Sequence, residues 1–330
     1  MTVKKNVRLI DIAQRLDLTA NTVSRALRDK SDIGEETKEL VRKTASEMGY
    51  IPNTIASSLR KGSSKTIAIV FDNLINPYFM IMADKIHRKL EPLNYATMIF
   101  AGSNGRLGSK QLIPIVSRKV DAIITFLEPT KKTLELLNKN DIPIILVGRV
   151  NQSLKVDSIS TKDYEGAYQI GKLFVSKGSK ECGYIGAPIS VECSQRRMSG
   201  FKQGIIDSGG TVSDQNLRYM NDELIIEDVE CLLKQNVDSI FCFNDMMALE
   251  VYSLLQNKGI KVPEEVKVAG FDNLRKEFTI PINLTTIDTD KDGIIDLAVD
   301  TLLTKIKSKS ELSIPRYINF DVQLIEGDTT

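Results

Sequence analysis

The chain has 330 residues, which is enough for two or three domains with cores of ordinary size. Hydrophobic residues make up 42% and charged residues 26%, and this balance excludes a largely disordered chain. The formal net charge of +1 conceals an uneven distribution. Residues 1–62 carry 12 Lys/Arg and 8 Asp/Glu, whereas the remaining residues carry 32 and 35. A small basic segment before a mildly acidic remainder favours a nucleic-acid-binding module attached to a second domain.

Several classes of protein lack their usual signals in this sequence. The N-terminus has no apolar core of a signal peptide and no apolar run approaches about 18 residues, so we expect a cytoplasmic protein without a membrane segment. No two cysteines have C-x-x-C spacing, so we expect reduced thiols and no metal site. The only histidine, His87, has no obvious nucleophile partner, and no Gly-rich phosphate loop occurs. We therefore expect neither catalytic residues nor a cofactor.

Residues 9–27 have the pattern of two short helices separated by a tight break. An apolar stripe at helical spacing marks the first helix: Ile12, Ala13 and Leu16. Asp17-Leu18 interrupts the stripe, and Thr19 then supplies an oxygen that can cap a second helix. The second helix is predicted to turn three apolar side chains inward: Val23, Ala26 and Leu27.

The outer face of the second helix is then left with small, amide, hydroxyl and guanidinium groups: Ala20, Asn21, Thr22, Ser24, Arg25 and Arg28. A short helix with such a face can lie in the major groove of DNA. A helical hairpin at the edge of some other domain is the competing interpretation of this stretch alone.

A third helix is predicted from Glu35, with a buried stripe of four residues, Leu40, Val41, Ala45 and Met48, and with Gly49 just beyond its end. Pro52 then breaks the chain, and Asn53 can cap a further helix over residues 54–60. An isolated helix this short is marginal in water, so we expect it to be ordered only when something else holds it. A plain linker is the alternative, but it leaves the apolar face of Ile55, Ala56 and Leu59 unexplained.

From Lys65 onward apolar strands alternate with amphipathic helices. The predicted strands are 66–71, 95–100, 122–126, 142–147, 158–160, 182–185, 216–219, 239–243, 266–269, 284–287 and, last, 317–324. Helices are predicted between them, for example over 78–93, 167–177, 195–208, 247–258 and 293–306. This alternation predicts parallel sheets covered on both faces, and the number of units favours two similar α/β subdomains. Ligands of such folds bind beyond the carboxyl ends of the strands.

Two sets of residues occur in the order typical of one known family. The first set is Ile12-Ala13, Thr22-Val23-Ser24-Arg25, Leu27, Thr37, Val41, Gly49-Tyr50, Pro52-Asn53, Ala56 and Leu59. The second set is Ile67-Ala68-Ile69-Val70, Asn76-Pro77-Tyr78-Phe79, Gly148-Arg149, Gly166-Ala167, Arg197-Met198-Ser199-Gly200-Phe201, Asn244-Asp245 with Ala248, Gly270-Phe271-Asp272 and Leu284-Thr285-Thr286-Ile287. Over essentially its whole length the chain resembles the lactose-repressor (LacI) family of bacterial transcription regulators.

The resemblance implies an all-α helix-turn-helix head and a hinge helix, joined to a body of two Rossmann-like subdomains like that of periplasmic binding proteins. It places the DNA-binding domain at 1–50, the hinge at 51–64 and the effector-binding body at 65–330. Within the body the N-subdomain is expected at about 65–161 and 291–319, and the C-subdomain at about 162–290 and 320–330.

For the head, the resemblance implies a set of DNA-binding residues: Thr19, Ala20, Asn21, Thr22, Ser24, Arg25, Arg28, Thr37, Asn53, Ala56 and Leu59. Asn21 can present an amide to adenine and Arg25 a guanidinium fork to guanine. Thr22, Ser24 and Thr37 suit phosphate contacts, although plain surface polarity also accounts for Thr22 and Ser24. Leu59 falls where the family inserts a leucine pair into the minor groove, which requires a dimer on a palindromic operator.

For the body, the implied effector-binding residues are Asn76, Tyr78, Phe79, Arg149, Gln195, Arg197, Asn244, Phe271 and Asp272. Core packing is an equal alternative for Phe79 and the favoured one for Phe271, and an internal ion-pair network is the alternative for Arg149, Arg197 and Asp272. The chain also departs from sugar-binding relatives, since it has Gly148 where they often have an acid, Gln195 where a second arginine is common, and no tryptophan.

We expect the effector to be a small molecule, namely a sugar or a sugar derivative, and the chain to act as a repressor. A regulator of the same family that answers to a phosphorylated carrier protein is the alternative, and an extracytoplasmic solute-binding protein is a rival for the body alone. The C-terminal residues show no apolar heptads, so a homodimer is expected rather than a tetramer held by a coiled coil.

Overall fold

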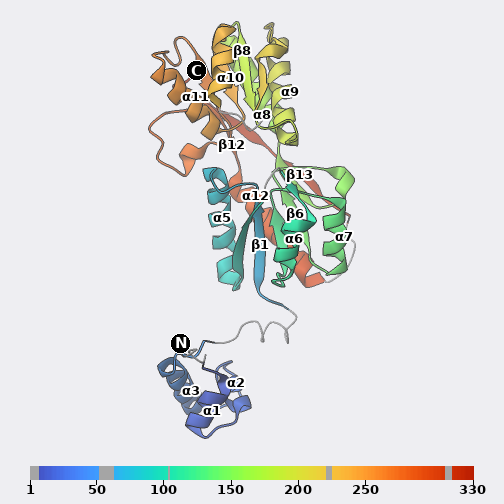
Figure 1. Ribbon diagram of the computed structural model, residues 1–330, viewed down its shortest axis with the longest axis vertical. Coiled ribbons are helices and arrows are strands. Elements are labelled where there is room, and N and C mark those ends of the chain that lie inside the picture. The colour runs from blue at the N-terminus through green and yellow to red at the C-terminus, as the bar shows by residue number, and fades with distance from the viewer. Residues whose placement is uncertain (1–6, 52–62, 103–104, 221–224, 309–313) are drawn as a thin grey trace. The chain divides into compact units, whose positions relative to one another are not determined.

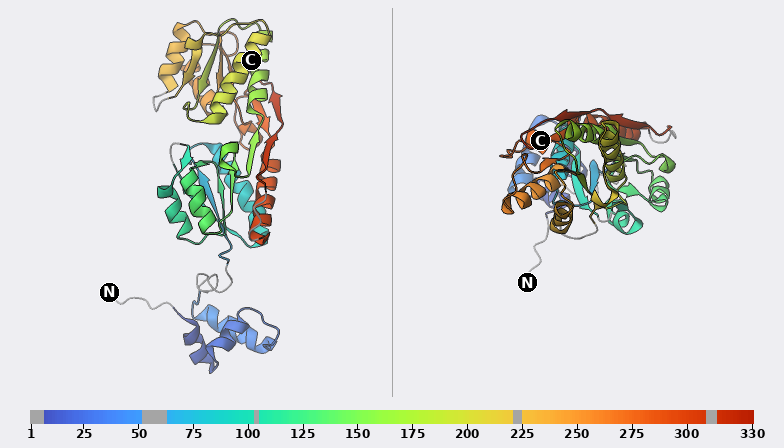
Figure 2. Two further views of the ribbon diagram at one scale, coloured as in Figure 1. Left: turned by 90° about the vertical axis from the view of Figure 1, so that its right-hand side faces the viewer. Right: turned by 90° about the horizontal axis from the view of Figure 1, so that it is seen from above.

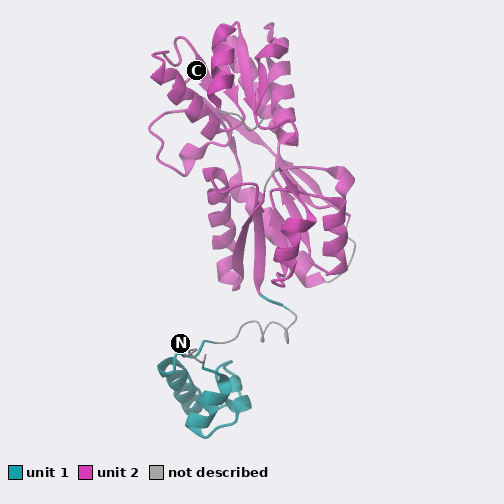
Figure 3. Cartoon of the chain, in the orientation of Figure 1, with its two compact units in different colours: residues 1–64 teal, residues 65–330 magenta. Residues whose placement is uncertain are grey.

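Figure 1 shows a computed structural model of the chain, and Figure 2 shows it from two further sides. The structure describes residues 7–51, 63–102, 105–220, 225–308 and 314–330. Contacts divide the chain into two compact units, residues 1–64 and 65–330 (Figure 3). We call them the head and the body and describe each by itself.

The head contains three helices, α1 (Leu9–Leu16), α2 (Ala20–Ala26) and α3 (Glu35–Glu47). The predicted cap at Thr19 is confirmed, because its hydroxyl accepts a hydrogen bond from the Thr22 N–H at 3.1 Å. The small core of the head is formed by side chains from all three helices: Ile12, Ala13, Val23, Ala26, Val41 and Ala45. The predicted inward and outward faces of α2 are therefore confirmed.

One prediction for the third helix is wrong. Leu40 is 50% exposed, although it was assigned to the buried stripe. Residues 41, 45 and 48 follow the helical period, and Leu40 lies about 100° away from Val41 around the axis. The aliphatic stem of Lys38 takes the buried position one turn before Val41. Gly49 has a φ of +67°, which confirms it as the left-handed residue that ends this helix.

The body begins with a six-stranded parallel sheet in the order β13-β7-β6-β4-β1-β2. Its strands are β1 (Thr66–Phe71), β2 (Ala96–Ala101), β4 (Ala122–Thr125), β6 (Ile144–Val147), β7 (Ser158–Thr161) and β13 (Tyr317–Phe320). Two further helices, α5 (Pro77–Leu90) and α12 (Lys291–Ser308), cover one face, and α6 (Ser109–Val116) and α7 (Lys131–Lys139) cover the other. Alternate residues of β1 enter the two cores, as expected for a strand buried on both faces.

A second parallel sheet has the order β11-β10-β8-β9. Its strands are β8 (Cys182–Gly186), β9 (Leu217–Tyr219), β10 (Ser239–Cys242) and β11 (Lys267–Ala269). Helices α8 (Asp163–Ser176) and α9 (Glu192–Asp207) pack on one face, and α10 (Ile225–Lys234) and α11 (Asp245–Asn257) pack on the other. The prediction of two α/β subdomains built on parallel sheets is confirmed.

The chain passes between the two sheets three times. It leaves β7 into α8, returns from β12 (Thr286–Thr289) into α12, and leaves β13 into β14 (Val322–Ile325). Strands β12 and β14 pair with each other antiparallel, and Figure 2 shows them beside both sheets. All three passages lie close to one another in the fold, and together they connect the two sheets.

Most predicted bounds differ from those of the structure by one to four residues, and two differences have a clear physical cause. The single strand predicted over 317–324 is two strands in different sheets, because the chain changes sheet at Asp321. The helix predicted over 78–93 ends at Leu90 and continues only as a 3₁₀ turn over Glu91–Leu93. Pro92 explains this end, since proline supplies no N–H to continue the helical hydrogen bonds.

No helix in the described ranges combines the length and the apolar character needed to span a bilayer.

Helices α8 and α9 pack closely because of the glycines Gly171, Gly200 and Gly204. A Cβ atom at Gly204 would clash with the carbonyl oxygen of Tyr168, and one at Gly200 with that of Tyr164. We predict that Gly204→Ala lowers the free energy of unfolding by about 1–3 kcal/mol, the usual cost of overpacking. Urea denaturation measures the loss, with Ser199→Ala on the exposed side of α9 as the control. Equal stability of both variants and the wild type would show that the helices can separate at no cost.

Candidate functional site: a cleft between two sheets

A cavity of about 700 Å³ lies where the carboxyl ends of both sheets face each other. Its wall contains the residues that follow individual strands: Asp72 after β1, Phe126 after β4, Arg149 after β6, Met220 after β9, Phe243 and Asn244 after β10, and Asp272 after β11. Parallel strands that all end at one edge bring these distant residues together. The cavity lies in the place predicted for a ligand, and its size suits a small molecule.

Arg197 of α9 is held on every side except toward the cavity. Its Nε donates to Asp163 Oδ1 at 2.8 Å and its Nη1 donates to the Phe243 carbonyl oxygen at 2.5 Å. Its guanidinium carbon lies 3.5 Å from the centre of the Phe271 ring and 4.6 Å from that of Phe243. Burial alone would lower the pKa of Arg197, but Asp163 and Asp272 raise it above its ordinary value. The side chain is therefore a fixed cation with donors left for a ligand.

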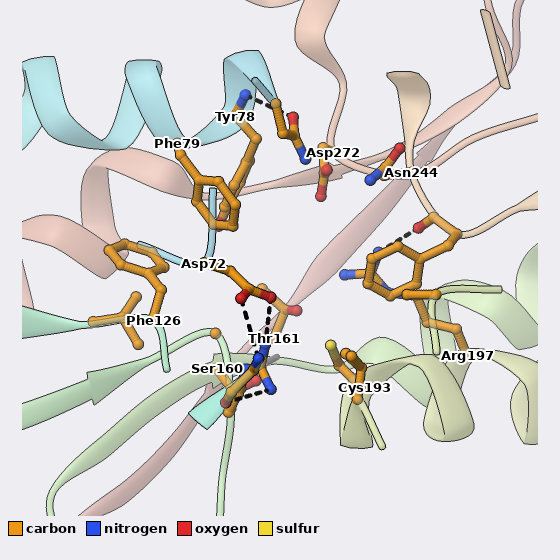
Figure 4. Close-up of a pocket in the computed structure, with 18 of the residues that line it drawn as sticks. Asp72, Tyr78, Phe79, Phe126, Ser160, Thr161, Cys193, Arg197, Asn244 and Asp272 are labelled. Carbon is orange, nitrogen blue, oxygen red and sulfur yellow. Dashed lines mark hydrogen bonds and ion pairs between the residues drawn. The ribbon is translucent and has the colours of Figure 1, made fainter. Parts of the chain in front are cut away.

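Two asparagines on the cavity wall cap helices and keep their NH₂ groups for other partners. Asn244 Oδ1 accepts from the Met247 N–H at 2.9 Å at the start of α11. Asn76 Oδ1 accepts from the Tyr78 N–H at 3.0 Å at the start of α5. Because capping uses only the oxygen, each amide can still donate two hydrogen bonds. Figure 4 shows Asn244 beside Asp272 at the cavity.

A second arginine lies on the wall formed by the first sheet. Arg149 Nη1 donates to the Gly105 carbonyl oxygen at 3.3 Å, and its Nη2 lies 3.8 Å from Asp72 Oδ2. Asp72 Oδ1 also accepts from the Gly105 N–H at 3.1 Å. Gly105 has a φ of +67°, and a Cβ there would lie 2.9 Å from Arg149 Nη1. A glycine is therefore needed for this loop to approach the arginine.

Aromatic rings form the apolar part of the wall. Phe79 packs edge-on against Tyr78 and Phe126, with ring centres 5.7 Å apart in both pairs. Behind it Phe71 lies 5.2 Å away in the core of the first sheet. Figure 4 places Tyr78, Phe79 and Phe126 along one side of the cavity and Arg197 on the opposite side. The cavity thus offers an apolar surface facing hydrogen-bonding groups.

Two buried acids near the cavity have raised pKa values. Burial raises the pKa of Asp272 to about 6, while Arg197 and Lys291 lower it. Burial and then Asp272 raise the pKa of Asp245 to about 7, although Asp245 accepts hydrogen bonds from Thr286 Oγ1 at 2.5 Å and from the Leu274 N–H at 2.7 Å. Asp245 does not line the cavity. Asp272 does, so it can accept from a ligand or, when protonated, donate to it.

Most of the predicted effector residues meet at this cavity. It is lined by Asn76, Tyr78, Phe79, Arg149, Arg197, Asn244 and Asp272. Gln195 is exposed and lies outside the cavity wall, where its Nε2 donates to the Ile189 carbonyl oxygen. Phe271 is completely buried and contacts the Arg197 guanidinium from the side of the core. It supports the site from behind.

Sequence reasoning missed several residues of this site. Asp72, Phe126, Thr161, Cys193 and Phe243 line the cavity, and Asp163 holds Arg197. Asp72, Phe126 and Phe243 each lie at or just beyond the end of a predicted strand, and that position is the signal that could have found them. Asp163 has no such signal, because its pairing with Arg197 and with Arg196 depends on tertiary structure.

On the head, the predicted DNA-binding residues lie on and beside α2. Ala20, Asn21, Arg25 and Arg28 are exposed, and Thr22, Ser24 and Thr37 are partly exposed. The Thr19 hydroxyl is used within the head as the cap of α2. Arg25 Nη2 forms an ion pair with Asp32 Oδ2, which lowers the pKa of Asp32. The predicted hinge residues Asn53, Ala56 and Leu59 lie outside the described residues, so their DNA contacts stay predictions.

The raised pKa of Asp272 predicts a pH dependence of stability. The folded chain keeps a proton on Asp272 up to a pH of about 6, whereas the unfolded chain loses it near 3.8. The contribution of this group to stability is therefore present below pH 3.8 and lost as the pH rises through 6.

An asparagine at this position would remain neutral throughout, so between pH 5 and pH 8 the stability of Asp272→Asn relative to the wild type should rise by about 1 kcal/mol or more. Urea denaturation at both pH values checks this, with the exposed Asp321→Asn as control. Parallel curves for wild type and Asp272→Asn would contradict it.

Comparisons with known proteins agree with this architecture. Residues 8–53 match the family model of bacterial regulatory proteins of the lacI family. Residues 64–322 match that of periplasmic binding proteins and the sugar binding domain of the LacI family. A curated relative, the HTH-type transcriptional repressor PurR of Vibrio atlanticus, is 26% identical over 327 residues, covering 97% of each chain. The repressor PurR of Photobacterium profundum is 26% identical over 317 residues, covering 91% of this chain and 92% of its own.

Solved structures show the same fold. The lac repressor dimer bound to operator and the anti-inducer ONPF superposes with a TM-score of 0.81 at 19% identity, over 98% of this chain and 99% of that chain. A LacI family transcriptional regulator from Enterococcus faecium with bound ribose gives a TM-score of 0.70 at 22% identity, over 80% of this chain and 98% of that chain. With a helix-turn-helix head and a two-sheet body that both match, the chain belongs to the LacI family of bacterial regulatory proteins and carries that family's DNA-binding and ligand-binding domains.

Proposed function

We propose that the chain is a homodimeric repressor whose affinity for a palindromic operator is set by a sugar or sugar derivative bound in the cleft of the body. The observation that carries the proposal is the fixed guanidinium of Arg197, which faces a wall of aromatic rings across the cavity. A ligand with an apolar ring face and several hydroxyl groups satisfies both sides of such a cavity.

The charges around the cavity favour a neutral ligand. Arg197 is paired with Asp163 and Arg149 lies near Asp72, so neither arginine needs an anionic ligand to neutralise it. Hydroxyl groups can accept from Arg197 and from the amides of Asn76 and Asn244, and can donate to Asp272. Tyr78 and Phe79 can contact the apolar face of a sugar ring.

For the operator, we propose that the exposed face of α2 enters the major groove. Arg25 reads guanine through its guanidinium and Asn21 reads adenine through its amide, while the hydroxyls beside them contact phosphates. The loop and α3 residues Arg28 and Thr37 complete the phosphate contacts. The exposure of these side chains in the head supports the assignment.

A dimer is supported by apolar side chains left exposed on the body. Met80 on α5 is 51% exposed, Leu93 after it is 44% exposed, and Ile99 on the edge strand β2 is 45% exposed. A second copy that covers such residues would bring two heads to the two halves of a palindromic site.

A thermal-shift screen tests the effector. The compounds are pentoses, hexoses, disaccharides, their phosphates and purine bases, and they include ribose and cellobiose, which are bound in two solved structures of the same fold. At 100 times its dissociation constant a ligand stabilises by about 2.7 kcal/mol, which raises the melting temperature by about 5 °C. A shift with sugars alone is expected. A shift only with purines, or only with a phosphorylated carrier protein, would overturn the sugar proposal.

The same assay locates the ligand when it is repeated with two variants. Asn244→Ser keeps a capping oxygen but loses the amide donors, so we predict that the sugar found in the screen binds about 5- to 10-fold more weakly. Gln195→Ala is the matched control and should bind as the wild type does, because Gln195 lies outside the cavity wall. Unchanged affinity of Asn244→Ser would place the sugar elsewhere.

For the head, we predict that Arg25→Ala weakens binding to the operator by roughly 1–3 kcal/mol and binding to random duplex by much less. Selection from a randomised duplex library defines the operator, and fluorescence anisotropy gives both affinities at one salt concentration. Arg15→Ala, which removes an exposed cation of α1, is the control. Equal losses on operator and random DNA would exclude base reading by Arg25.

A further inference from the structure

We infer that Asp32 positions Arg25 for reading its base and thereby determines how strongly the head discriminates its operator from other DNA. The inference rests on the proposed base-reading role of Arg25. In this role the Asp32 carboxylate holds the Arg25 guanidinium in place, and the effect is measured as the ratio of operator affinity to random-DNA affinity.

The pairing leaves Arg25 able to contact DNA. Asp32 Oδ2 pairs with Nη2 of Arg25, and both side chains remain about half exposed, at 48% and 44%. A guanidinium has five N–H donors, so one ion pair leaves enough of them for the O6 and N7 atoms of guanine. The carboxylate therefore restricts the rotamers of a long side chain without covering its donors.

Backbone hydrogen bonds hold the loop that carries Asp32 beside Arg25. The Arg25 carbonyl oxygen accepts from the N–H groups of Arg28 and Lys30, both at 3.2 Å. The Ile33 N–H in turn donates to the Lys30 carbonyl oxygen at 3.2 Å, and Ile33 packs against the core of the head. The loop that carries Asp32 is thus bonded to the end of α2 on one side and anchored in the core on the other.

A second acid of the same loop is used differently. Asp29 Oδ1 lies 3.1 Å from Lys38 Nζ and 2.8 Å from Arg42 Nη2, and both cations belong to α3. Its charge is neutralised within the scaffold of the head. Asp32 instead shares the cation proposed to read a base.

The negative charge of Asp32 also affects the binding of DNA of any sequence. It repels the phosphate backbone whatever the base sequence, so it weakens random and operator binding together. Only on the operator does the positioning of Arg25 compensate for that repulsion. The repulsion lowers both affinities by a similar factor and leaves their ratio unchanged, whereas the positioning of Arg25 raises the ratio, so the two effects are separable.

The test uses the full chain and the operator obtained by selection from a randomised duplex library. Affinities for that operator and for a random duplex are measured for the wild type, Asp32→Asn and Asp29→Asn at one salt concentration. We expect Asp32→Asn to raise random-DNA affinity and to lower the operator-to-random ratio by about three- to fivefold, in line with the strength of exposed ion pairs. Asp29→Asn removes the same charge without touching Arg25 and should leave the ratio unchanged.

Two further variants separate the possible failures. If Arg25→Ala lowers the ratio but Asp32→Asn leaves it equal to that of Asp29→Asn, the positioning role is overturned and the base-reading role stands. If Arg25→Ala leaves the ratio unchanged, the proposed function of Arg25 fails and the role of Asp32 fails with it. Asp32→Glu keeps the carboxylate and should restore most of the ratio. Thermal unfolding of each variant verifies that the head remains folded.

Discussion

The burial of one guanidinium organises the body of this protein. A cation with almost no exposure is tolerated only when its donors and its ring faces are occupied, and Arg197 meets that demand through Asp163, the Phe243 carbonyl oxygen and two phenylalanine rings. Those partners come from α8, from the residue after β10 and from the loop after β11. Their convergence requires the strands of the second sheet to end at one edge, where the cavity lies. The wall of the cleft that belongs to the second sheet depends on this arrangement.

Much of the fold could be predicted because its signals are local. The strand over Thr66–Phe71 is entirely apolar after its first residue and bounded by polar residues, and its predicted bounds are those of the structure. The change of sheet at Asp321 could not be predicted, since a strand that continues in a second sheet keeps the same apolar pattern. Leu40 shows a related difficulty, because its neighbour Val41 has the same chemistry and only packing decides which of the two is buried.

The candidate site was predictable where a side chain lies near a strand end, and less so where it depends on helix rotation or on distant partners. Gln195 and Arg197 are two residues apart on α9 and therefore point about 200° apart, so only one of them can reach the cavity. Phe271 and Asp272 are adjacent, and one enters the core while the other meets the cavity. Asp163 lies 34 residues before Arg197, and no periodicity relates them. Sequence reasoning thus located the cleft more easily than it located the residues that hold it in shape.

The close contact of α8 and α9 has a consequence for how the cleft can change shape. Helices whose backbones touch through Gly171, Gly200 and Gly204 have no side-chain layer in which to slide, so they behave as a single rigid block. Asp163 begins one of these helices and Arg197 lies on the other. The cation and its partner therefore travel together when the two sheets change their separation. Adaptation to ligands of different size then comes from residues outside this block, such as Phe79 and Arg149 on the opposite wall.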